Sequence, residues 1–275
     1  MTPDFRTLER SDDQLTPPGM TFVTVRSTHL DRRADVLLYA SDDSEAKQDV
    51  PIIVLLHGVF GSHWAWAFKG AAHLTAQRLV DQGVIGDCVL CMPSDGLWGD
   101  GSGYLKHEHA DYERWIVEEA VGIPMQLLPQ CSETSAVYIA GLSMGGFGAL
   151  RLAARNPDVF AAAYGHSSVT SASDLRLFTV DYEQQVSQQS DEDSLIESVV
   201  ASGESMPPFG FDCGLEDELL PANRELHRQL EAAGVPHEYH ELSGQHDWAY
   251  WRSRLEVSLS FFGRHAQTQI RTVES

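Results

Sequence analysis

The sequence has 275 residues, 43% of them hydrophobic, and its 40 acidic side chains against 19 basic ones give a formal net charge of −21. A surface this acidic repels phosphate backbones and anionic lipid, so neither nucleic acid nor a membrane is expected as a partner. No apolar run reaches the roughly 18 residues of a membrane span, and the first residues, MTPDFRTLERSDDQ, contain no apolar signal segment, so we expect a cytoplasmic protein.

The first predicted elements form a strand pair and a buried strand. Residues 20–40 alternate between apolar and polar side chains in two runs, which predicts an antiparallel pair. After a polar linker, residues 50–58 (VPIIVLLHG) form an unbroken apolar run, typical of a strand covered on both faces of a parallel sheet.

Strand and helix patterns then alternate along the chain. Further strands are predicted at 87–92, 135–141, 159–164, 207–212 and 236–242. Helices are predicted near 64–82, at 110–128, 144–155 and 220–233, and from about 247. This rhythm predicts one α/β domain over residues 1–275, with a doubly wound, mostly parallel sheet and helices on both faces. The polar stretch 167–205 interrupts it and is interpreted either as a cap over the functional site or as a surface excursion.

Two of the four cysteines, Cys88 and Cys91, form a C-x-x-C pattern inside the strand-like stretch DCVLCMP. Side chains three residues apart on a strand face opposite sides of the sheet, so this pair is not expected to share a metal or a disulfide. His107 and His109, in KHEHAD, are interpreted as the solvated start of a helix rather than as metal ligands. Reduced thiols are expected.

Ser143 lies where the strand pattern of YIAGLSMGGFGALRLAARNP turns into a helix pattern. A serine at this junction is either a helix N-cap or a nucleophile. Gly141 and Gly145 complete a G-x-S-x-G pattern, and small residues are needed there because the strand and helix backbones nearly touch. The glycines therefore favour the nucleophile.

A serine nucleophile needs a base and an acid that orients the base, each from another strand end. His246 follows the last predicted strand, whereas His237 and His240 lie inside it, so His246 is the best base. Asp217 follows the strand predicted at 207–212 and is the preferred acid. Two rivals lie in the same region: Asp212 and Glu216.

The transition state of acyl transfer also needs N–H donors for its oxyanion. The N–H of Met144, directly after the serine, is one candidate. The second is expected in the loop after IIVLLHG, where Gly58 allows close approach of the backbone: Val59 is preferred and Phe60 is the rival. His57 is expected to brace this loop by hydrogen bonding.

Five motifs together resemble the esterase D-type α/β-hydrolases: LLHGVFGSHWAW, DYERWIVEE, GLSMGGFGALRLA, DCGLEDELL and GQHDWAYW. This group includes tributyrin and acetyl esterases, S-formylglutathione hydrolases, feruloyl esterases and antigen 85-type mycolyltransferases. The resemblance extends from about residue 20 to residue 262. It implies the α/β-hydrolase fold, the triad Ser143, Asp217 and His246, and oxyanion donors at Val59 and Met144.

The expected function is that of a serine carboxylesterase acting on short-chain acyl esters, with a small-molecule ester as its partner and without a metal or an organic cofactor. Aromatic side chains near these loops are candidates for substrate contact: Phe60, Trp64, Trp66, Trp98 and Trp248. An acyltransferase of the mycolyltransferase type and an S-formylglutathione-type thioesterase stay open as alternatives. The sequence does not decide whether the protein forms a homo-oligomer. It also leaves open what the long glycine-rich stretch MPSDGLWGDGSGYLKHEH, residues 92–109, contributes to the pocket.

Overall fold

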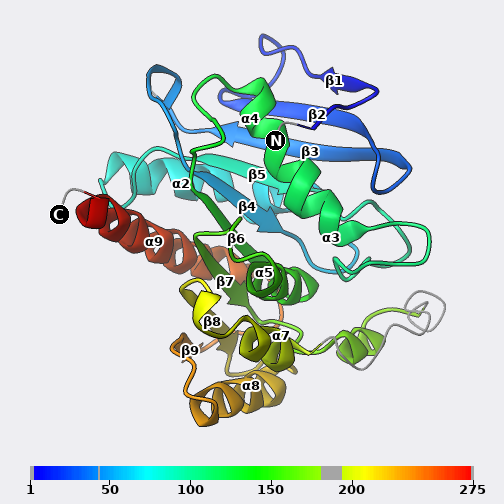
Figure 1. The fold of residues 1–275 in the computed structure, drawn as a ribbon, viewed down its shortest axis with the longest axis vertical. Coiled ribbons are helices and arrows are strands. Elements are labelled where there is room, and N and C mark those ends of the chain that lie inside the picture. The colour runs from blue at the N-terminus through cyan, green and yellow to red at the C-terminus, as the bar shows by residue number, and fades with distance from the viewer. Residues whose placement is uncertain (1–2, 43, 181–193, 274–275) are drawn as a thin grey trace.

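The computed structural model describes residues 3–42, 44–180 and 194–273, and within them one sheet has nine strands in the order β1-β2-β3-β5-β4-β6-β7-β8-β9 (Figure 1). The strands are β1 Leu8–Arg10, β2 Met20–Ser27, β3 Arg32–Ala40, β4 Ile52–Leu56, β5 Val89–Pro93, β6 Val137–Leu142, β7 Ala162–His166, β8 Phe209–Gly214 and β9 Glu238–Leu242. The pairs β1–β2, β2–β3 and β3–β5 are antiparallel. The remaining neighbours, in the order β5, β4, β6, β7, β8 and β9, pair in parallel. The predicted mixed α/β sheet is thus confirmed.

Helices cover both faces of this sheet. They are α1 Ala65–Phe68, α2 Ala72–Asp81, α3 Tyr112–Arg114, the π-helix η2 Trp115–Ala120, α4 Val121–Leu127, α5 Met144–Arg155, α7 Leu195–Ser202, α8 Leu220–Ala232 and α9 Trp248–Val273. Short 3₁₀ turns are η1 Ser44–Ala46, η3 Ala172–Leu177 and η4 Gly203–Ser205. Apolar side chains of α1, α2 and α9 share one core, and those of η2, α5, α7 and α8 share the core on the other face (Figure 1).

The central strand β4 shows why its sequence is continuously apolar. Ile52, Val54 and Leu56 point into the core beneath α5, whereas Ile53 and Leu55 point into the core beneath α9. Because successive side chains alternate between faces and both faces are covered by helices, each position of the strand must be apolar.

Two predicted helices are interrupted. The helix predicted at 64–82 breaks at Ala71, whose φ is +53°, next to Gly70, where an added Cβ would lie 2.6 Å from the carbonyl oxygen of Trp66. The helix predicted at 110–128 begins at Tyr112 and contains the π-helical turn. Pro124 has no N–H, so the carbonyl of Ala120 lacks its helical donor and accepts from Cys91 Sγ instead.

Each of the strands predicted from residue 87 onward begins two or three residues later than predicted. In β8 the reason is chemical, because Pro207 and Pro208 have no N–H to donate to a ladder and pairing begins after them, at Phe209. In β7 a turn at Pro157–Val159 precedes the strand, and Phe160 enters the core without pairing. The edge strand β1 was not predicted, since three residues are too short for a pattern to show.

The polar stretch 167–205 is only partly within the described residues, since 181–193 lie outside them. Its second half belongs to the helical layer: Ser194 caps α7, and Leu195 and Val199 enter the core with α5. Its first half approaches the functional site through Phe178. The whole-stretch cap predicted from sequence therefore stays a prediction.

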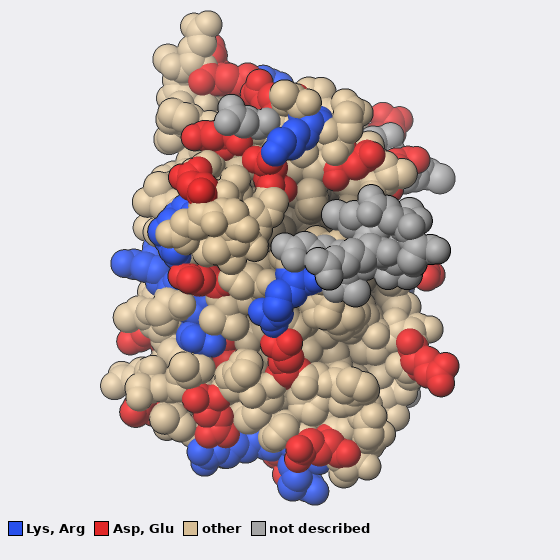
Figure 2. Space-filling view, turned by 90° about the vertical axis from the view of Figure 1, so that its left-hand side faces the viewer, with Lys and Arg blue, Asp and Glu red and all other residues tan. Residues whose placement is uncertain are grey.

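Acidic and basic side chains are interspersed on the face shown in Figure 2, which is the left-hand side of the view in Figure 1. None of the helices in the described part of the chain has the length and apolar composition that crossing a membrane requires. All four cysteines are buried free thiols, and Cys88 and Cys91 lie in the two separate cores, as the strand spacing predicted.

Candidate active site

Ser143 forms a tight junction between β6 and α5. Its φ is +53°, a left-handed value that a non-glycine residue adopts only at a cost in free energy. A Cβ on Gly141 would lie 2.1 Å from the carbonyl oxygen of Gly145, and one on Gly145 would lie 2.3 Å from the carbonyl oxygen of Leu56. The two glycines of G-x-S-x-G are therefore required by the contact between helix and strands.

The side chain of Ser143 does not cap the helix. Although Ser143 occupies the N-cap position of α5, its hydroxyl accepts no hydrogen bond from the helix N–H groups. Its Oγ lies 3.0 Å from Nε2 of His246, and the residue is 2% exposed. Its own N–H donates to the carbonyl of His166 at 2.9 Å. The N-cap interpretation is wrong, and the hydroxyl faces a potential base.

His246 is oriented by Asp217. Its Nδ1 lies 2.9 Å and 3.1 Å from the two carboxylate oxygens of Asp217, which also accepts the N–H of Leu219 at 2.8 Å. Since a carboxylate only accepts, the ring proton lies on Nδ1, and Nε2 is free to accept from Ser143. Phe178 stacks on the imidazole at a centroid distance of 5.6 Å, and Trp251 contacts its edge at 5.0 Å.

The carboxyl group of Asp217 is held in its charged form. Burial would raise its pKa, but the hydrogen bond and charge of His246 and the N–H of Leu219 outweigh burial, and the pKa lies below its ordinary value. A charged Asp217 would stabilise an imidazolium at His246 if that ring accepted a proton.

The two rival carboxylates are used elsewhere. Glu216 accepts the N–H of Gly244 at 2.6 Å and so holds the loop that leads to His246. Asp212 is fully buried and accepts from Tyr250 Oη at 2.8 Å and from Nδ1 of His166 at 3.0 Å. Burial raises the pKa of Asp212, but the neighbouring His166 and Arg254 lower it further, to below its ordinary value.

A second Ser–His–Asp chain thus exists in the core. Nε2 of His166 lies 3.0 Å from Oγ of Ser258, and Ser258, His166 and Asp212 are all fully buried. Because none of these three side chains is exposed, a substrate cannot reach them in this conformation. This chain was not predicted from the sequence, where its signal is a polar residue within each of three stretches: YGHSS, GFDCG and EVSLSFF.

The predicted oxyanion donors lie beside Ser143. A Cβ on Gly58 would lie 3.2 Å from Cβ of Ser143, so the loop after β4 runs against the serine. The N–H of Phe60, the rival donor, is occupied by the carbonyl of Asp100 at 2.8 Å. In the described residues the N–H groups of Val59 and Met144 make no hydrogen bond, which leaves both available to a ligand.

The aromatic candidates for substrate contact have different environments. Phe60 is 71% exposed and Trp64 is 42% exposed. Trp66 is wrong as a candidate, because it is fully buried and donates to the carbonyl of Leu56. Trp98 packs on His107 at 4.9 Å, and Trp248 packs between Trp66 and Trp251 at 5.7 and 5.4 Å. Substrate contact by Phe60, Trp64, Trp98 and Trp248 stays a prediction.

The interpretation of His107 as part of a solvated helix start is also wrong. Its ring lies between Trp98 and Tyr112, and its Nε2 lies 2.9 Å from the carbonyl oxygen of Ser102. His109 is exposed, as expected. Over residues 3–42, 44–180 and 194–273 no group of three or more His, Cys, Asp or Glu side chains is placed to hold a metal ion.

The chain resembles known esterases along most of its length. The model of the Esterase family, described as "Putative esterase", matches residues 27–262. The chain is similar to an acetyl esterase of Caldicellulosiruptor saccharolyticus, at 24% identity over 236 residues, 79% of this chain and 85% of that protein. It is also similar to Esterase Rv1288 of Mycobacterium tuberculosis, at 31% identity over 259 residues, 80% of this chain and 54% of that protein, so it spans about half the length of that relative.

Among solved structures, a ferulic acid esterase superposes with a TM-score of 0.77 at 26% identity, covering 90% of this chain and 97% of that one. Together with the strand order, this likeness confirms the α/β-hydrolase fold.

Proposed function

The chain belongs to the Esterase family of carboxylic ester hydrolases, and from this premise we propose that it hydrolyses short-chain acyl esters through an acyl-enzyme on Ser143. One observation carries the proposal: the Ser143 hydroxyl, which caps nothing, lies 3.0 Å from Nε2 of a histidine whose other nitrogen is held by a buried carboxylate. The short-chain preference is supported by the acetyl esterase among the relatives.

In the proposed acylation, Oγ of Ser143 attacks the ester carbonyl carbon while Nε2 of His246 accepts the hydroxyl proton. The carbonyl oxygen becomes negative and is stabilised by the N–H groups of Val59 and Met144. The bond to the alcohol oxygen then breaks, and His246 returns its proton to that oxygen as the alcohol leaves. Asp217 keeps the imidazole in the tautomer that accepts at Nε2.

In the proposed deacylation, water replaces the alcohol. His246 accepts a proton from the water as its oxygen attacks the acyl carbon, and the same N–H groups stabilise the second oxyanion. The bond to Oγ breaks, Ser143 recovers its proton from His246, and the carboxylic acid is released.

A chain-length series of p-nitrophenyl esters tests the substrate class. We expect acetate and butyrate esters to give a higher kcat/KM than octanoate and longer esters, with the Ser143→Ala variant as the inactive control. An optimum at decanoate or longer would contradict the short-chain proposal.

Two further assays separate the alternatives that share this triad. Addition of a primary alcohol should not convert the major product from acid to ester, since water is the proposed acceptor. S-formylglutathione should be a poor substrate relative to p-nitrophenyl acetate. Predominant acyl transfer, or a preference for the thioester, would replace the proposed reaction with one of the other two.

A further inference from the structure

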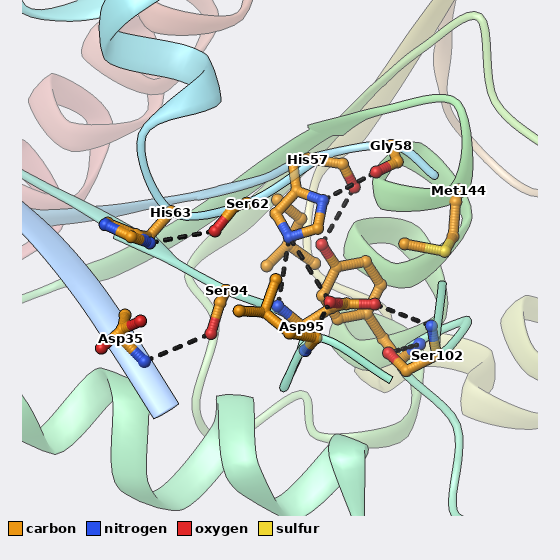
Figure 3. Close-up of polar contacts among 12 residues, drawn as sticks. Asp35, His57, Gly58, Ser62, His63, Ser94, Asp95, Ser102 and Met144 are labelled. Carbon is orange, nitrogen blue, oxygen red and sulfur yellow. Dashed lines mark hydrogen bonds and ion pairs between the residues drawn. The ribbon is translucent and has the colours of Figure 1, made fainter. Parts of the chain in front are cut away.

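The glycine-rich loop, residues 94–104, follows β5 and lies against the proposed oxyanion hole (Figure 3). Its backbone is unusual, because five of its residues have a φ between +51° and +87°. They are Gly96, Leu97, Gly99, Gly103 and Tyr104. This conformation is sterically strained at Leu97 and Tyr104, which have a Cβ, and such strain concentrates at functional sites.

His57 connects this loop to the peptide that contains the Val59 N–H. The N–H of Asp95 donates to Nε2 of His57 at 3.1 Å, so the ring proton lies on Nδ1, which donates to the carbonyl of Gly58 at 2.7 Å (Figure 3). The carbonyl of Gly58 and the N–H of Val59 belong to one planar peptide unit. Fixing the direction of the carbonyl therefore also fixes the direction in which the N–H of Val59 points.

Asp95 fixes the shape of the loop. Its carboxylate is buried and accepts two backbone N–H groups, from Ser102 at 2.7 Å and from Leu97 at 3.1 Å. These bonds close the loop on itself and hold the Asp95 N–H against the imidazole. Tyr104, at the far end of the loop, donates from its hydroxyl to the carbonyl of His57 at 2.9 Å. The loop thus holds His57 at both its ring and its backbone.

The same loop contacts the residue that contains the other proposed donor. The N–H of Gly103 lies 3.3 Å from Sδ of Met144. A Cβ on Gly101 would lie 2.6 Å from that sulfur and 3.2 Å from Cγ1 of Val59. Gly101 is therefore packed against both Val59 and Met144, and any larger residue would displace one of them.

We propose that Asp95, acting through the glycine-rich loop and His57, is a positioning residue that aims the N–H of Val59 and fixes its distance from the N–H of Met144. The inference rests on the proposed function of the two N–H groups as oxyanion donors. It adds the hydrogen-bonded loop that holds them in position before the substrate binds. An oxyanion exists only in the transition state and in tetrahedral adducts. If the N–H of Val59 no longer points at it, kcat should fall while KM stays nearly unchanged.

Two substitutions at His57 distinguish a changed direction of the Val59 N–H from a general loss of stability. The amide of Asn, one bond beyond Cγ, takes the place of Nδ1, whereas the longer side chain of Gln takes the place of Nε2. His57→Asn can still donate to the carbonyl of Gly58, and His57→Gln cannot. With p-nitrophenyl acetate we expect His57→Gln to lose about 100-fold in kcat, as removal of one oxyanion donor does. His57→Asn should keep kcat to within about 10-fold of wild type.

Asp95→Asn and a matched control complete the set. An Asn at position 95 keeps the size of the side chain but loses one of its two N–H acceptors, so kcat should fall about 10-fold with KM unchanged. His63→Gln is the control, since His63 is a nearby histidine that pairs with Ser62 and, among the described residues, makes no hydrogen bond to Gly58 or to the loop (Figure 3). It should retain wild-type kcat.

The inhibition constant of an alkyl trifluoromethyl ketone is the second readout, because its tetrahedral adduct places an oxyanion between the two donors. It should weaken in parallel with kcat in His57→Gln and Asp95→Asn. Equal kcat in His57→Asn and His57→Gln, or unchanged inhibition in both weakened variants, would overturn the positioning role. If instead Ser143→Ala hydrolyses the ester as fast as wild type, the proposed function itself fails, and the two failures are thereby distinguished.

Discussion

Ser143 combines backbone strain with an unused hydrogen-bonding position. Its φ of +53° and the absence of a cap bond both cost stability, and Gly141 and Gly145 allow the strand and helix backbones to meet closely around it. The role of the glycines could be predicted from their spacing. The sequence analysis preferred Val59 to Phe60 as an oxyanion donor, but the sequence could not show that the carbonyl of Asp100 occupies the N–H of Phe60.

The choice of Asp217 as the acid is tested by Asp217→Asn. We expect this variant to fold normally and to lose about 10⁴ in kcat, because the histidine tautomer that accepts at Nε2 is no longer favoured. Steady-state hydrolysis of p-nitrophenyl acetate and a thermal melt measure the two effects. If Asp217→Asn retains activity, the carboxylate that orients His246 has been misidentified.

The elements that meet at the site are joined beneath it by the buried chain of Ser258, His166 and Asp212. It links β7, β8 and α9, and the main-chain carbonyl of His166 also accepts the N–H of Ser143. Tyr250, four residues after His246, donates to Asp212 and so ties the start of α9 to β8. The pairing in this network could not be predicted from the sequence, because its hydrogen-bonded side chains are at least 38 residues apart and no local pattern shows which of them meet.

Asp212→Asn should therefore lower the stability of the folded protein. The substitution replaces one of the two buried acceptor oxygens with an NH2 donor and leaves Arg254 without its buried counter-charge, and we expect a loss of about 3 kcal/mol in the free energy of unfolding. The exposed Asp158 gives a matched control, and Asp158→Asn should unfold like wild type. Chemical denaturation of the two variants makes the comparison, and equal midpoints would contradict the structural role of Asp212.

The pH dependence of stability follows from the same carboxylate. The pKa of folded Asp212 lies below the ordinary value of 3.8, so between the two values the unfolded chain binds more protons than the folded one. The stabilisation is present above pH 3.8 and is lost as the pH falls through the folded pKa. Wild type should lose stability in this acid range more steeply than Asp212→Asn, as thermal melts from pH 5 downward would show. Parallel curves for the two proteins would contradict this.

In the molecule as a whole, topology explains why the site could be predicted at all. Ser143 and His246 are 103 residues apart, but parallel strands bring their carboxyl ends to one edge of the sheet, and each proposed triad residue follows such an end. The alternation of strands and helices was therefore enough to bring the residues together. Helix breaks, the π-helix and the paths of the loops depend on tertiary contacts that no local pattern reveals.

The kcat of Ser143→Ala on p-nitrophenyl acetate tests the central claim most directly. If the hydroxyl is the nucleophile, kcat should fall by about 10⁶ while the melting temperature stays close to that of wild type, since no cap bond is lost. A variant that retained more than a tenth of the wild-type kcat would show that the acyl group is transferred elsewhere, and the proposed mechanism at Ser143 would be wrong.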